Sequence, residues 1–185
     1  MNTNPYRLAG WSALTVAILT LLTIVTFGIG VSAGWDKVKM PNDLATALMY
    51  LLHPPVLAGL DKSMARPRPA QLTIGILAAL YMATVQILYI ADAGLFASTP
   101  VSAILSTAIL SLVYLVYHWQ ARREQSLPNG LTIVGMVANA GGALASASSI
   151  IAENHPLVWI GGSLYMLNVV WLIWIGRIWL RNARG

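Results

Sequence analysis

His53 is the residue of this chain best suited to chemistry, because it lies inside an apolar stretch at about 44–60 and is followed directly by Pro54 and Pro55. An ionisable side chain in such a stretch is costly, and it often marks a functional site. The two prolines have no backbone N–H, so carbonyls one turn earlier, near Tyr50, lose their usual helical donors. We therefore expect an interrupted helix in which an imidazole and free carbonyls form a small polar site.

Three roles are open to His53. In the first, a neutral imidazole bonds a carbonyl of a neighbouring segment and is purely structural. In the second, His53 contacts a ligand or handles a proton. In the third it ligates a metal or a haem, which would need a second ligand at a suitable depth. His118 and His155 are expected at opposite ends of the apolar segments, so the sequence does not predict that the three histidines converge.

The stretch at about 131–152 is dominated by small residues, and Gly135, Asn139 and Ala143 follow a four-residue spacing. Small side chains allow helices to approach closely, so we expect a central helix with neighbours on several sides. Alternatively, the small residues line a cavity and the Asn139 amide contacts a ligand. We therefore take His53, Tyr50 and Asn139 as the candidate ligand-binding residues, and we predict no catalytic residue and no metal site.

The elements that must position these residues are apolar helices. The chain has 185 residues, of which 57% are hydrophobic and 9% charged, whereas a soluble domain has about 25% charged residues. Segments of about 20 apolar residues cross a bilayer as helices. The sequence predicts six such spans, at about 11–33, 44–60, 71–91, 101–118, 131–152 and 157–178. We therefore predict an all-α integral membrane protein, a single domain over 1–185 and a six-helix bundle with a short, proline-broken second span. A re-entrant second span is the alternative.

The cationic residues predict the orientation of this bundle, because positively charged loops favour the cytoplasmic side. Lys37 and Lys39 stand alone in one set of gaps. Every second gap or tail carries the other cations, which are Arg7, Lys62, Arg66, Arg68, Arg122, Arg123, Arg177, Arg181 and Arg184. We expect both termini on the cytoplasmic side of a cell membrane of the bacterial inner type. The net charge of +5 then reflects orientation and anionic lipid headgroups, and no nucleic-acid partner is predicted.

Several classes of protein are excluded by what the sequence lacks. With no cysteine there is no disulfide, thiolate metal site or cysteine nucleophile. There is no Gly-x-Ser-x-Gly motif, no His-Glu-x-x-His motif and no phosphate-binding loop. The sequence thus favours a protein that is not an enzyme, and it names no cofactor.

Two functions remain. The first is binding or movement of a small apolar or weakly polar solute through a cavity within the membrane, between the broken second span and the small-residue fifth span. The second is a non-catalytic subunit or assembly factor of a larger membrane complex. The expected partners are membrane lipids, a small hydrophobic ligand in the first case, and membrane proteins or further copies of this chain in the second.

Overall fold

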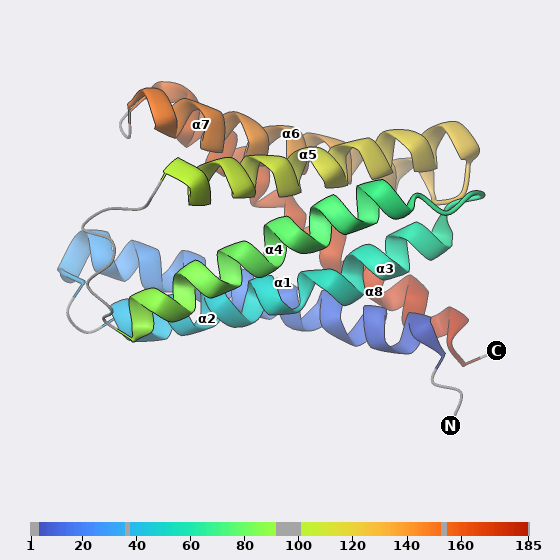
Figure 1. Ribbon diagram of the computed structural model, residues 1–185, viewed down its shortest axis with the longest axis horizontal. Coiled ribbons are helices and arrows are strands. Elements are labelled where there is room, and N and C mark those ends of the chain that lie inside the picture. Colours follow the sequence, from blue (N-terminus) through green and yellow to red (C-terminus); the bar gives the residue numbers. More distant parts are fainter. Residues whose placement is uncertain (1–3, 36–37, 92–100, 153–154, 185) are drawn as a thin grey trace.

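The computed structural model describes residues 4–35, 38–91, 101–152 and 155–184 as a bundle of α-helices (Figure 1). Six helical units, two of them broken, are long and apolar enough to cross a membrane. This confirms the predicted all-α fold and, within the described residues, the six long apolar helical units. The helices are α1 (Pro5–Ala33), α2 (Lys39–Leu51), α3 (His53–Ser63), α4 (Pro69–Ile90), α5 (Val101–Glu124), α6 (Asn129–Ile151), α7 (Pro156–Tyr165) and α8 (Leu167–Asn182).

Two helices are longer than their apolar segments. α1 begins at Pro5, where the Asn4 side chain accepts a hydrogen bond from the Tyr6 N–H at 3.1 Å. α5 continues beyond His118 to Glu124. A helix can continue into polar residues beyond its apolar segment. Composition therefore located the apolar segments better than it located the helix ends. Lys37 lies outside the described residues.

The predicted interruption of the second span is confirmed. α2 ends at Leu51 and α3 begins at His53, so that Pro54 and Pro55 lie in the first turn of α3. A proline in that position is well tolerated, because its missing N–H would have no partner within the helix. α2 and α3 together form a unit of 25 residues, and in Figure 1 they follow one another along the length of the bundle. The unit is therefore not as short as predicted, because the helices extend beyond the apolar residues 44–60 at both ends.

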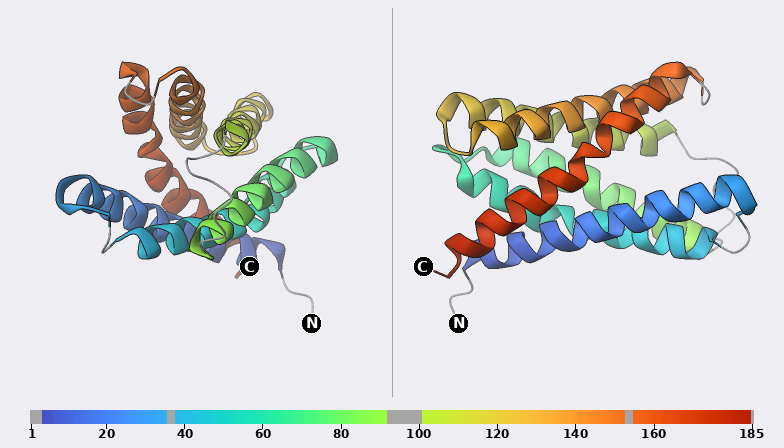
Figure 2. Two further views of the ribbon diagram at one scale, coloured as in Figure 1. Left: turned by 60° about the vertical axis from the view of Figure 1, so that its left-hand side comes forward. Right: turned by 180° about the vertical axis from the view of Figure 1, so that it is seen from behind.

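A second break, at Met166, was not predicted. α7 ends at Tyr165 and α8 begins at Leu167. The two halves then pack on different partners, since α7 lies along α6 whereas α8 crosses to α1. Figure 2 shows α8 running diagonally across the bundle after this break. No proline stands at the break itself, so its origin must lie in packing.

α6 has neighbours on several sides, as its small residues predict, because it packs against α5, α7 and α8. It is not central, however, since Ile133 and Val137 leave one of its faces exposed. The other side of the bundle is built from α1, α2, α3 and α4, with α4 also packed on α5. The described termini lie at one end of the bundle, together with the α3–α4 and α5–α6 connections (Figure 1). We call this the basic end, since the cations of the alternate gaps lie there, and Lys39 lies at the opposite end.

Candidate functional site

The break between α2 and α3 turns His53 toward α5. The imidazole is 2% exposed, and its Nδ1 lies 2.7 Å from the hydroxyl of Tyr114. Its Nε2 is buried and has no hydrogen-bond partner among the described groups. The ring of Tyr50 lies 5.8 Å from the imidazole, and its hydroxyl is 3.4 Å from Oγ1 of Thr107. The structure thus brings two of the predicted site residues together, and it supplies their partners from α5.

The polar cluster continues along α5 to His118, whose ring is fully buried. Its ring stacks on Tyr114 with centroids 6.4 Å apart, and it meets the edge of Trp171 at 4.7 Å. Neither ring nitrogen of His118 has a hydrogen-bond partner among the described groups. The three histidines do not converge among the described residues, but two of them, His53 and His118, contact the same tyrosine, which the sequence did not predict. His155 does lie apart, at the start of α7.

A signal for this cluster was present in the sequence. Thr107, Ser111, Tyr114 and His118 are spaced by three or four residues, which places them on one face of a helix. Three of these side chains are buried and Thr107 is half-buried. Polar residues on one face of an otherwise apolar helix predict that this face points into the bundle.

Asn139, the third predicted ligand contact, bonds within its own helix. Its side chain is 2% exposed, and its amide donates to the Gly135 carbonyl of its own helix at 2.8 Å. Gly135 in turn makes room for His118, because a Cβ at this position would lie 2.4 Å from the imidazole Nε2. No hydrogen bond joins Asn139 to Tyr50 or His53 among the described residues. This part of α6 therefore accommodates the cluster on α5.

An open groove of about 340 Å³ lies between α1, α2 and the break in the sixth span. Four polar side chains and several apolar ones form its wall. The lining residues are Thr20, Thr23, Ile24, Phe27, Asn42, Thr46, Met49, Gly162, Tyr165 and Met166. All of them come from the middle of their helical units or from the half that lies away from the basic end.

The threonines of this groove use their protons within their own helices. Thr20 donates to the Val16 carbonyl at 2.8 Å, Thr23 to Thr20 at 2.8 Å and Thr46 to Asn42 at 2.7 Å. A hydroxyl that has donated its proton still has lone pairs that accept hydrogen bonds. The groove therefore offers acceptor oxygens on an otherwise apolar wall.

Tyr165 separates the groove from the buried cluster. It lines the groove, and it lies near Tyr50 and Tyr114. Its ring packs on Gly142, where a Cβ would lie 2.7 Å from the ring. The groove and the His53 cluster are thus two layers of one region.

The arrangement offers no evident ligand set for a metal ion, since no three His, Asp or Glu side chains of the described ranges converge. No protein-family model, curated protein or solved structure matches this chain. The class of protein is therefore defined by the fold alone, as an all-α bundle with six helices long and apolar enough to cross a membrane.

Proposed function

We propose that this chain is a multi-pass membrane protein that binds a small, mostly apolar solute in the groove between α1, α2 and the break of the sixth span. The observation that carries the proposal is the lining of the groove, where threonine oxygens stand among Ile24, Phe27, Met49 and Met166. Six apolar helices of sufficient length support placement in a membrane. Their cation distribution supports cytoplasmic termini and a bacterial inner membrane.

The chemistry of the lining indicates what kind of solute fits. Lipid tails offer no hydrogen bonds, so a solute hydroxyl or amine that donates to a threonine gains a contact that the bilayer core lacks. Hydrogen bonds inside membrane proteins contribute only about 0.6 kcal/mol on average. The apolar body of the solute must therefore provide most of the affinity, and the threonines orient it.

The buried cluster forms the second polar layer of this proposed site. A solute that passes Tyr165 would next meet Tyr50 and the unpartnered Nε2 of His53, which are the contacts proposed from the sequence. Asn139 remains a candidate only as a positioning residue, because its amide bonds its own helix. Movement of the solute, as opposed to binding alone, would follow this path.

Gly162 provides a sharp test, since it lines the groove and a Cβ there would meet no atom within 4 Å. Leucine at this position fills the groove without a backbone clash, and it favours the helix over glycine by roughly 0.5–1 kcal/mol. Gly28→Leu is the matched control, because Gly28 is an exposed helical glycine on α1 with equally open space and lies outside the groove.

The probe is a diazirine-bearing medium-chain alcohol, photolysed with the protein in lipid nanodiscs and located by peptide mass spectrometry. We expect adducts on the groove residues, reduced several-fold by Gly162→Leu and unchanged by Gly28→Leu. Uniform labelling of all outward-facing helices, with no effect of Gly162→Leu, would refute the proposal. If labelling were uniform and partner proteins were also recovered in stoichiometric amounts, the chain would instead be a non-catalytic subunit of a larger membrane complex.

A further inference from the structure

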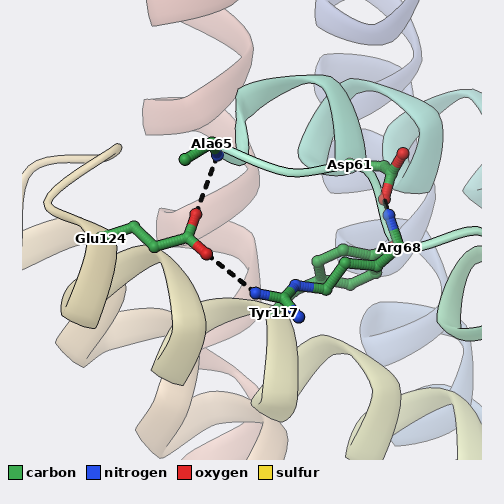
Figure 3. A network of polar contacts seen from close by, with 5 residues as sticks. All are labelled: Asp61, Ala65, Arg68, Tyr117 and Glu124. Atoms are coloured by element: carbon green, nitrogen blue, oxygen red, sulfur yellow. Dashed lines mark hydrogen bonds and ion pairs between the residues drawn. The ribbon is translucent and has the colours of Figure 1, made fainter.

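The connection between α3 and α4 is held against the end of α5 by two carboxylates (Figure 3). Oδ1 of Asp61, which is 8% exposed, accepts from the backbone N–H of Arg68 at 2.8 Å and from the Tyr117 hydroxyl at 3.0 Å. Glu124 accepts from the Ala65 N–H at 2.8 Å with one oxygen and from Nη2 of Arg68 at 2.8 Å with the other. These bonds fix the Arg68 guanidinium in place.

A pocket of about 330 Å³ lies beside this network at the basic end, lined by Arg68, Trp119, Gln120, Arg123 and Glu124. Two of its polar atoms are buried without a partner among the described groups, the Nε of Arg68 and the Oε1 of Gln120. The first is a cationic N–H donor and the second is a neutral acceptor. A ligand that satisfies both must carry an acceptor oxygen and a hydroxyl or amine donor, and an anionic oxygen is the stronger acceptor for a guanidinium.

The charge of the pocket favours an anion. The described ranges contain one ion pair, between Arg68 and Glu124, so Arg123 has no carboxylate partner there. Its guanidinium instead lies over the Trp119 ring, 4.9 Å from the centroid. Arginine contacts phosphate strongly because its N–H groups match the geometry of the phosphate oxygens. The ion pair offsets the charges of Glu124 and Arg68 against one another, so Arg123 gives the pocket its net positive charge.

We propose that this pocket, the headgroup pocket, binds the anionic glycerophosphate headgroup of a membrane phospholipid. The phosphate contacts the Arg68 Nε–H and the Arg123 guanidinium, and a headgroup hydroxyl donates to Oε1 of Gln120. Trp119 is 48% exposed and lies where tryptophans mark the membrane–water interface, so its indole borders the glycerol and the first acyl carbons. A free phosphate has the same anionic chemistry but lacks the acyl chains.

The test is native mass spectrometry of the full chain released from nanodiscs of equal parts phosphatidylglycerol, phosphatidylmethanol and phosphatidylethanolamine. We expect one retained lipid, with phosphatidylglycerol first, phosphatidylmethanol weaker because it lacks the glycerol hydroxyls, and phosphatidylethanolamine last. Arg123→Gln should reduce retention of both anionic lipids by roughly tenfold, the effect of one charge-assisted hydrogen bond. Gln120→Leu should lower phosphatidylglycerol only, to the level of phosphatidylmethanol.

Arg122→Gln is the matched control, because Arg122 is the exposed neighbour of Arg123 and does not line the pocket. Equal loss in Arg122→Gln and Arg123→Gln would show diffuse attraction to basic residues and would overturn the proposal. So would retention of phosphatidylethanolamine at the level of phosphatidylglycerol. Displacement of the lipid by millimolar inorganic phosphate would reassign the pocket to a soluble phosphate and would also contradict it.

Discussion

α6 and α7 approach one another closely at Gly141 and Gly161. A Cβ on Gly161 would lie 2.6 Å from the Ala145 nitrogen and 2.6 Å from the Gly141 carbonyl oxygen. A Cβ on Gly141 would lie 2.5 Å from the Leu164 Cβ and 2.7 Å from the Gly161 carbonyl oxygen. The obstructing atoms include backbone on both helices, so no rotamer change relieves the clash and the helices must move apart.

We predict that Gly161→Ala is less stable than Gly162→Ala by about 1–3 kcal/mol, the usual cost of overpacking a close contact. Both changes replace a glycine of α7 and gain the same helix propensity, which is about 0.8–1 kcal/mol. At Gly162 a Cβ meets no atom within 4 Å, so only the propensity gain remains there. The difference between the neighbouring variants therefore isolates the packing of α6 on α7.

Reversible unfolding in mixed micelles, followed by circular dichroism as the denaturing detergent is increased, measures both free energies on one scale. Gly141→Ala should be destabilising in the same way. The double variant of Gly141 and Gly161 should cost less than the sum, because either alanine alone already separates the helices. Equal stabilities of Gly161→Ala and Gly162→Ala would refute the close approach of α6 and α7.

Two further predictions concern the buried cluster and the orientation. Tyr114→Phe should lower the free energy of unfolding by about 1–3 kcal/mol in the same assay, because it removes the buried hydroxyl bonded to His53 and leaves the imidazole unpartnered. Tyr50→Phe should lower it less, because that variant loses only a hydrogen bond of 3.4 Å. Because the chain has no cysteine, a single introduced cysteine reports on which side of the membrane it lies. A membrane-impermeant maleimide should label Lys39→Cys in intact cells, and it should label Asn182→Cys only after lysis. Labelling of both in intact cells would contradict the proposed cytoplasmic C-terminus.

The broken second span was predictable from sequence, whereas the broken sixth span was not. The sequence His53-Pro54-Pro55 predicts the break directly, because proline lacks the N–H that continues a helix. At Met166 the residues are ordinary helix formers, and we attribute the break to two glycine contacts with different partners. Gly161 holds α7 on α6, and a Cβ on Gly176 of α8 would lie 3.0 Å from the Gly10 carbonyl oxygen of α1. A straight helix cannot pack along both α6 and α1. The sequence does not show this, because it does not reveal the relative positions of α6 and α1.

The candidate site was likewise predictable only in part. His53 was identifiable because its cost within an apolar stretch is a local property, and Tyr50 follows from its place one turn before the prolines. Tyr114, the partner of His53, lies 61 residues along the chain, and one sequence does not reveal such a pairing. The groove was not predicted either, because it depends on how Gly162, Tyr165 and Met166 lie relative to α1 and α2.

The buried cluster contains more polar atoms than its packing requires. His53 Nε2, both nitrogens of His118 and the Trp171 Nε1 are buried without hydrogen-bond partners among the described groups. Each such atom costs about 1–3 kcal/mol relative to a satisfied one. Leucine or phenylalanine would fill the same space beside Gly135 without that cost. Native proteins depart from such rules mainly at functional sites, so the cluster behind Tyr165 is where we expect a solute that moves beyond the groove to make its next polar contacts.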